Sequence, residues 1–189
     1  GSADYILTAG ITGIVMHIGR GVDFGPIVQK FLIDHGLDVF IPEAKALLRE
    51  FGERYVLTVD LAYDENAGLS QANASDIANA SAFPEQKRAP TSTSIPKRSE
   101  ALIEALPKDR LFPDIGHKTI ELFKKYINSA GSIFVNGPAG MYETEPWADG
   151  TRELWRAIAD APGYTVIGGG DTISAATKFT ELSKYGYVC

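Results

Sequence analysis

A glycine-rich turn near the end of the sequence carries residues that could hold an anionic ligand. The β-branched run at 165–167 leads into three consecutive glycines, 168–170, and Asp171 and Thr172 follow at once. Glycine has no Cβ, so a phosphate group can approach its backbone closely. Apolar residues then recur at helical spacing. This pattern predicts that Asp171 and Thr172 lie in the first turn of a helix, where unpaired N–H groups and the helix dipole favour anions.

Asp171 has two alternative interpretations. Its side chain caps the helix, which is an ordinary structural role, or it binds Mg²⁺ beside a nucleotide phosphate while Thr172 donates to a phosphate oxygen. Three consecutive glycines are more than a cap requires, so the anion site is favoured. The spacing matches neither GxGxxG nor GxxxxGK[ST], so a dinucleotide fold and a P-loop are both poorly supported.

A second polar cluster follows an earlier strand pattern. Asn136 ends the predicted strand 132–136, where its amide can reach a phosphate or a neighbouring loop. Pro138 offers a flat apolar edge to a base or sugar, and Glu143 can accept hydrogen bonds from ribose hydroxyls. The alternative is a structural turn with a surface glutamate, which is the commoner case for Glu143 taken alone.

Other chemistry has little support in this sequence. His17, His35 and His117 are scattered, no Ser-His-Asp arrangement is visible, and each histidine is expected to pack, cap or lie at the surface. Cys189 is the single cysteine, which excludes a disulfide within the chain and fits a reducing, cytoplasmic compartment. No apolar run approaches the roughly 20 residues of a membrane helix.

Composition indicates an ordinary globular protein. The chain has 189 residues, 44 % of them hydrophobic and 22 % charged, which suits a single domain over residues 3–189. Its net charge of −6 argues against nucleic acid as a partner. Residues 1–2 resemble the remnant of a cleaved tag.

Strand and helix patterns alternate along most of the chain. The sequence predicts strands over 4–8, 55–59, 132–136, 164–167 and from 187, and helices around 14–18, 24–35, 41–51, 117–128 and 154–161 and after 171. This alternation predicts an α/β fold, a parallel β-sheet with helices on both faces in a Rossmann-like three-layer arrangement. Ligands of such sheets bind beyond the carboxyl ends of the strands, where residues 8–10, 136–138 and 168–172 would meet.

The alternation fails in the middle of the chain. Residues 67–99 are rich in Ser, Ala, Asn, Thr and Pro. We interpret residues 67 to about 111 as a variable surface excursion with little regular structure. A short helix is expected over 100–106, and a turn over 112–116.

Three segments in order, 134–143, 148–151 and 166–172, resemble phosphoglycerate kinases, and 4–10 and 113–119 are similar to archaeal members. The resemblance covers most of the chain except the excursion. It implies the C-terminal, nucleotide-binding domain of a two-domain kinase. The N-terminal domain of that family, which holds 3-phosphoglycerate, has no counterpart here.

The resemblance also implies a site. Asp171 would engage the Mg²⁺ of the nucleotide, Thr172 would contact its phosphates, Glu143 would bind the ribose and Gly10 would line the adenine pocket. No residue is assigned to catalysis beyond the phosphate contact of Thr172. The complete implied nucleotide site is Gly10, Asn136, Pro138, Glu143, Gly168, Gly169, Gly170, Asp171 and Thr172.

The implied parent reaction transfers a phosphoryl group between ATP and the carboxyl group of 3-phosphoglycerate, with Mg²⁺ as cofactor. We expect the isolated chain to be a monomer that binds ATP or ADP without turnover. Two alternatives stay open: a non-catalytic nucleotide-binding or protein-interaction module, and a dehydrogenase-like domain that binds NAD.

Overall fold

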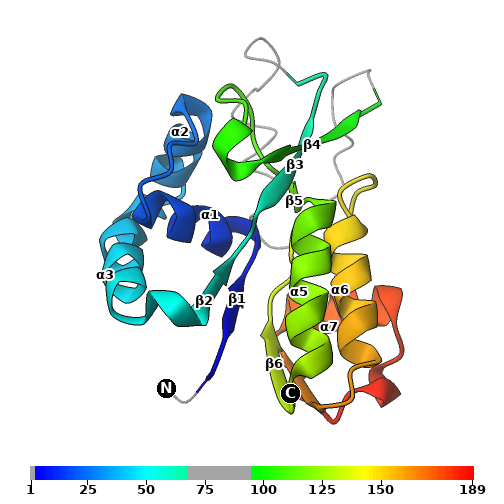
Figure 1. The fold of residues 1–189 in the computed structure, drawn as a ribbon. Coiled ribbons are helices and arrows are strands. Elements are labelled where there is room, and N and C mark those ends of the chain that lie inside the picture. Colours follow the sequence, from blue (N-terminus) through cyan, green and yellow to red (C-terminus); the bar gives the residue numbers. More distant parts are fainter. Residues whose placement is uncertain (1–2, 68–94) are drawn as a thin grey trace.

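The computed structural model describes residues 3–67 and 95–189, and it contains the predicted alternation of helices and strands (Figure 1). The helices are α1 (Gly10–Gly19), α2 (Pro26–Asp34), α3 (Ile41–Phe51), α5 (His117–Ser129), α6 (Asp149–Ala159) and α7 (Gly170–Phe179). Short 3₁₀ turns are η1 (Asp38–Phe40), η2 (Gly52–Arg54), η3 (Ile103–Ala105) and η4 (Leu182–Lys184). No helix of the described residues is long and apolar enough to cross a membrane.

The strands of the described residues are distributed over three sheets. They are β1 (Ile6–Thr8), β2 (Tyr55–Leu57), β3 (Asp60–Asp64), β4 (Arg98–Leu102), β5 (Asp114–Ile115), β6 (Ser132–Asn136), β7 (Tyr164–Gly168) and β8 (Tyr187–Val188). Two sheets are parallel, β1-β2 and β6-β7-β8, and the third, β4-β3-β5, is antiparallel. The predicted mixed α/β class with parallel strands and helices is therefore confirmed, while the parallel strands form two sheets rather than one.

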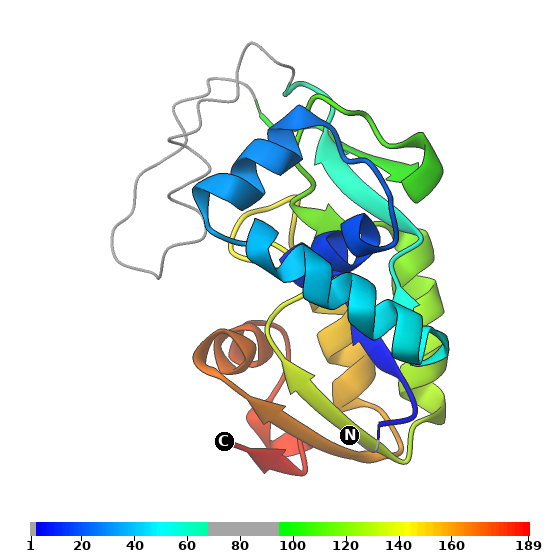
Figure 2. The ribbon, with the colours of Figure 1, turned by 90° about the vertical axis from the view of Figure 1, so that its left-hand side faces the viewer.

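The helices are arranged differently around the two parallel sheets (Figures 1 and 2). α1, α2 and α3 lie beside β1-β2, and α5 and α6 pack together on one face of β6-β7-β8. In Figure 2 the opposite face of β6-β7-β8 turns toward the viewer with no helix drawn over it. Phe134 of β6 is 72 % exposed, and Tyr187 of β8, whose register partner on β7 is Val166, is 58 % exposed.

The antiparallel sheet corrects two expectations. Residues 98–102 form strand β4 and only 103–105 form a helical turn, so the predicted helix over 100–106 is wrong. The predicted turn over 112–116 contains strand β5. Most of the predicted excursion, residues 68–94, lies outside the described residues. Residues 98–102, which are described, form β4 because β3 supplies backbone partners along the whole strand, from Asp60↔Leu102 to Asp64↔Arg98.

The N-terminus of α5 is occupied by a side chain from β3. The Asp60 carboxylate accepts the backbone N–H groups of Lys118 at 3.0 Å and of Thr119 at 2.8 Å. Gly116 makes room for it, since a Cβ there would come within 2.3 Å of that carboxylate. A buried aspartate thus satisfies two of the orphan donors of α5 and joins that helix to the antiparallel sheet.

Candidate functional site

The ends of β6 and β7 meet at one edge of their sheet. In the parallel register Asn136 is the partner of Gly168, and both strands end there. Beyond this point the chain turns into the loop 137–148 on one side and into α7 on the other. The sequence prediction that Asn136 and Asp171 lie at a shared edge therefore agrees with the observed register.

Two contacts join these strand ends. The backbone N–H of Gly137 donates to Thr172 Oγ1 at 2.6 Å. The amide of Asn136 lies over Gly169, where a Cβ would come within 2.9 Å of Asn136 Oδ1. Gly169 also has φ of 91°, which L side chains rarely adopt, so glycine is required there for conformation as well as for space.

The turn presents its backbone to the outside. Gly169, Gly170 and Asp171 are exposed, whereas the Thr172 side chain is buried, with 1 % of the residue exposed. α7 begins at Gly170, and its N-cap Gly169 makes no side-chain capping bond. Asp171 lies inside the first turn rather than at the N-cap, so the capping alternative is not what the structure shows for it.

Gly168 differs from the two glycines that follow it. It is buried, and a Cβ there would come within 2.8 Å of Cys189 Sγ, which follows β8. Because Gly168 has no side chain, β7 can pack closely against Cys189 at the end of β8. Gly169 and Gly170 are the glycines that offer exposed backbone at this edge.

The end of β1 reaches the same edge. Gly10 begins α1 with φ of 55°, and a Cβ there would lie 3.5 Å from the carbonyl oxygen of Ala139 and 3.7 Å from that of Pro138. We name this shared edge the rim. It consists of residues 8–10, 136–138 and 168–172.

An open apolar hollow of about 260 Å³ includes Ile11, the residue that follows Gly10 in the chain. Its walls come from α1, from α3 and from the segment between α2 and α3. The residues that line it are Ile11, Thr12, Val15, Met16, Leu37, Phe40, Glu43, Ala44 and Leu47.

The loop after β6 carries Glu143 on its exposed side. Its neighbour Tyr142 is buried, and this burial raises the pKa of the Tyr142 phenol, with further contributions from the negative charges of Glu143 and Asp171. Both predicted carboxylates therefore act on the same phenol, one from the loop and one from α7. The N–H of Met141 anchors the loop by donating to the carbonyl of Pro113 at 2.8 Å.

A buried ion group supports this loop from behind. Arg98 of β4 donates to Asp114 Oδ2 at 2.9 Å and to the carbonyl of Pro146 at 3.0 Å. The Asp114 carboxylate, fully buried, also accepts the N–H of Gly150 in α6 at 2.9 Å. Burial raises the pKa of Asp114 to about 6, against the lowering effects of the Gly150 N–H and of Arg98.

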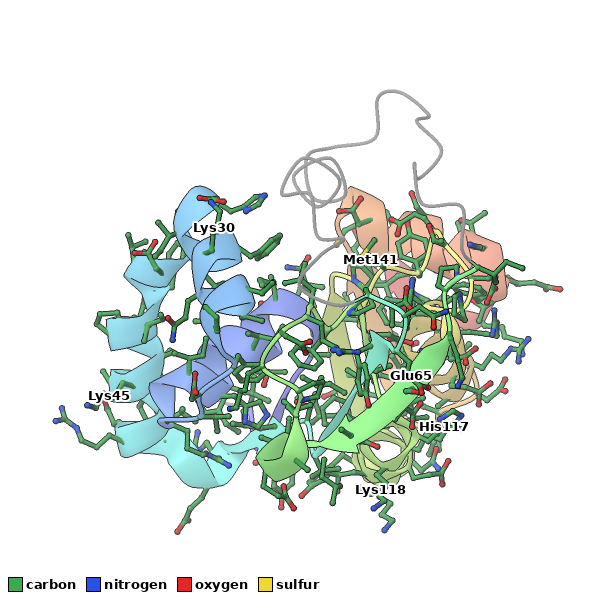
Figure 3. The ribbon with its side chains drawn as sticks, turned by 90° about the horizontal axis from the view of Figure 1, so that it is seen from above. Lys30, Lys45, Glu65, His117, Lys118 and Met141 are labelled. Carbon is green, nitrogen blue, oxygen red and sulfur yellow. The ribbon has the colours of Figure 1, made fainter. Side chains whose placement is uncertain are left out.

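The three histidines lie outside the rim. His17 is buried, and its Nε2 lies 2.9 Å from both oxygens of Thr58. His35 Nδ1 contacts the Phe31 carbonyl, and His117 Nδ1 pairs with Glu100 at 2.6 Å. Figure 3 shows His117 at the start of α5, well apart from Met141 in the loop after β6.

Three residues that support the rim were not in the predicted site. Thr151 Oγ1 accepts the N–H of Ala139 at 3.1 Å, and Trp155 Nε1 donates to the carbonyl of Thr172 at 3.2 Å. Lys178, in the last turn of α7, donates to the carbonyl of Tyr142. Each contact joins residues at least 12 positions apart, so helical periodicity could not have indicated them.

The fold and the rim define an α/β protein of the parallel-strand class with a glycine-rich turn into a helix. The model of the phosphoglycerate kinase family matches residues 1–189, and the chain belongs to that family. The archaeal resemblance seen in the sequence agrees with the curated relatives, which include several archaeal phosphoglycerate kinases.

Two of these relatives show the extent of the match. The phosphoglycerate kinase of Methanothermus fervidus is 31 % identical over 188 residues, which is 100 % of this chain and 38 % of the relative. That of Methanopyrus kandleri is 32 % identical over 171 residues, 90 % of this chain and 35 % of the relative. The chain thus spans little more than a third of the length of these curated relatives.

Solved structures agree on the fold. The phosphoglycerate kinase of Pyrococcus horikoshii OT3 superposes with a TM-score of 0.76 at 26 % identity, covering 98 % of this chain and 39 % of that one. The Coxiella burnetii enzyme, at 21 % identity and a TM-score of 0.73, supports the fold alone.

Proposed function

We propose that residues 3–189 are the nucleotide-binding domain of a phosphoglycerate kinase and that the rim binds Mg-ADP or Mg-ATP. The observation that carries this proposal is the exposed N-terminus of α7 opposite Asn136. Gly169 and Gly170 leave the backbone open, and the first N–H groups of α7 point out of the helix toward this space. A polyphosphate there would gain hydrogen bonds and the favourable end of the helix dipole.

Asp171 is suited to the magnesium ion of such a nucleotide. Its carboxylate is exposed, one residue beyond the start of α7, and hard oxygen ligands are what Mg²⁺ prefers. Within residues 3–67 and 95–189 no three His, Cys, Asp or Glu side chains gather as a metal site. Phosphate oxygens and water would therefore supply the other ligands, so the ion would arrive with the nucleotide.

The nucleoside has complementary surfaces nearby. Gly10 and Pro138 approach each other at the rim, and the apolar hollow that starts at Ile11 suits a base. Glu143, exposed on the loop, would accept hydrogen bonds from the ribose hydroxyls. In this arrangement Thr172 holds Gly137 in place through a buried bond and would contact the phosphates through its backbone.

For the complete reaction we propose phosphoryl transfer between ATP and the carboxyl group of 3-phosphoglycerate. Such transfer depends on positioning and on neutralising the developing charge. This chain would hold and orient the nucleotide, and bound Mg²⁺ would neutralise phosphate charge. The acceptor site would belong to the remaining length of the relatives, so the 189-residue chain would be an inactive, cytoplasmic monomer that binds no nucleic acid.

The experiment is thermal unfolding of the purified chain with Mg-ADP, with NAD and without ligand. The proposal requires that Mg-ADP raises the melting temperature in a concentration-dependent way and that NAD does not. Stabilisation by NAD alone would favour a dinucleotide domain, and stabilisation by neither would favour an interaction module. A steady-state kinase assay completes the test, because turnover near that of an intact kinase would contradict the proposed inactivity.

A further inference from the structure

A lysine in the last turn of α7 reaches back to the loop that carries Glu143. Lys178 Nζ donates to the carbonyl of Tyr142 at 2.7 Å and lies 3.4 Å from the carbonyl of Glu143. These carbonyls belong to residues 36 and 35 positions earlier in the chain. The contact is therefore a tertiary bond between α7 and the loop, not part of the helix end.

Aromatic rings hold this ammonium in place. It lies 5.7 Å from the centroid of the Tyr142 ring and 5.3 Å from that of Phe179, distances at which a cation is attracted to a ring face. The two rings pack edge to face, with centroids 6.2 Å apart. Among the described residues Lys178 forms no ion pair with a carboxylate, so the partners of its ammonium there are these carbonyls and rings.

The same helix carries the proposed phosphate contacts at its other end. Asp171 and Lys178 are seven residues apart on α7, which corresponds to about 10 Å along the axis. A helix of this length is rigid over that distance because its backbone is hydrogen-bonded throughout. The spacing between the phosphate end of the rim and the backbone of Glu143 is thus set by one element, provided that Lys178 holds the loop against it.

We propose that Lys178 is a positioning residue that holds the Glu143 carboxylate at the ribose. This inference rests on the proposed function, since it concerns the ribose end of the same nucleotide site. It makes the recognition of ribose hydroxyls depend on a side chain that itself touches no nucleotide. The binding affinity of nucleotides without those hydroxyls should then not depend on Lys178.

The test compares Mg-ADP with Mg-2′,3′-dideoxy-ADP by titration calorimetry. The wild-type chain should bind Mg-ADP about tenfold more tightly, as expected for hydrogen bonds to a charged acceptor. Lys178→Met keeps the length of the side chain and removes its donors. It should bring the ratio of the two affinities, Mg-ADP over the dideoxy nucleotide, close to one. The affinity for Mg-ADP should fall, while the affinity for the dideoxy nucleotide should stay within about twofold of wild type.

Two variants sharpen this test. Lys184→Met removes an exposed lysine of the same surface whose partner is Asp160 at 2.7 Å, and it should leave the ratio unchanged. Glu143→Ala should lower the ratio as Lys178→Met does, and the double variant should lose no more than Glu143→Ala alone. If Lys178→Met does not fold, Lys178→Gln, whose amide is too short to span the gap, carries the same comparison.

The outcomes separate the two proposals. A wild-type chain that binds no Mg-ADP overturns the proposed function and this inference together. A wild-type chain that discriminates against the dideoxy nucleotide, with a Lys178→Met variant that discriminates equally, overturns only the role of Lys178. If Lys178→Met lowered the affinity for both nucleotides equally, this role would also be overturned, since that result would show that Lys178 only stabilises the fold.

Discussion

Gly137 and Thr172 connect the ends of two neighbouring strands through one short bond, from the Gly137 N–H to the buried Thr172 Oγ1 at 2.6 Å. Through it the loop after β6 and the first turn of α7 become one unit. The indole of Trp155 extends this unit by donating to the carbonyl of Thr172, so α6 is tied to the same point. The rim is therefore a supported structure rather than three independent loops.

Thr172→Val tests this connection. Valine has nearly the same shape but accepts no hydrogen bond, so the N–H of Gly137 loses its partner. We expect a loss of about 1–3 kcal/mol in the free energy of unfolding, measured by urea denaturation. Thr177→Val is the matched control, because Thr177 lies on the exposed side of the same helix, and it should stay within about 0.5 kcal/mol of wild type.

Gly169 and Gly170 should respond differently to alanine. Gly169→Ala places a Cβ at φ of 91° and 2.9 Å from Asn136 Oδ1, so it should destabilise the fold by about 1–2 kcal/mol. Gly170→Ala meets no atom within 4 Å and should leave the melting temperature nearly unchanged. Its added methyl should nevertheless weaken Mg-ADP binding. Undiminished affinity in Gly170→Ala would argue against phosphate at this turn.

His17 should make the chain less stable in mild acid. Burial lowers its pKa from 6.5 to about 4, so the folded state resists protonation that the unfolded state accepts. The contribution is complete above pH 6.5 and is lost as the pH falls toward about 4, by up to about 1.4 kcal/mol per pH unit. His17→Gln should flatten the stability profile over this range.

Asp114 should make the folded state more stable, relative to the unfolded state, as the pH falls. Because burial raises its pKa from 3.8 to about 6, the folded state takes up a proton before the unfolded state does. This contribution rises as the pH falls from about 6 to 3.8 and is absent well above pH 6. Asp114→Asn keeps an acceptor for Gly150 but cannot titrate, so its loss of stability in acid should be steeper than that of wild type. Parallel profiles from pH-dependent urea unfolding would contradict this.

The sequence predicted best where the signal is local. The strand at 164–167, the triple glycine and the following helix are adjacent in the chain, and each has its own periodicity or turn chemistry. The structure places them within about one residue of the prediction as β7 and α7.

Non-local pairing explains what the sequence did not predict. The apolar residues around 101–106 fit a helix as well as a strand, and the choice was decided by β3 and by the Arg98–Asp114 pair, which join distant parts of the chain. In the same way, nothing near Lys178 indicates that it bonds the loop at Tyr142. Nor does a strand's own pattern say which strand lies beside it, so the division of the parallel strands into two sheets was not predictable.

The most direct test of the account is the Mg²⁺ dependence of ADP binding to wild type and Asp171→Asn, measured by calorimetry at matched ionic strength. Asp160→Asn, an exposed surface variant, is the control. We expect Mg²⁺ to tighten ADP binding to wild type and to Asp160→Asn, and we expect Asp171→Asn to lose this gain while melting within about 2 °C of wild type. If Mg²⁺ strengthens ADP binding equally in all three proteins, Asp171 does not hold the ion and the proposed nucleotide site is wrong.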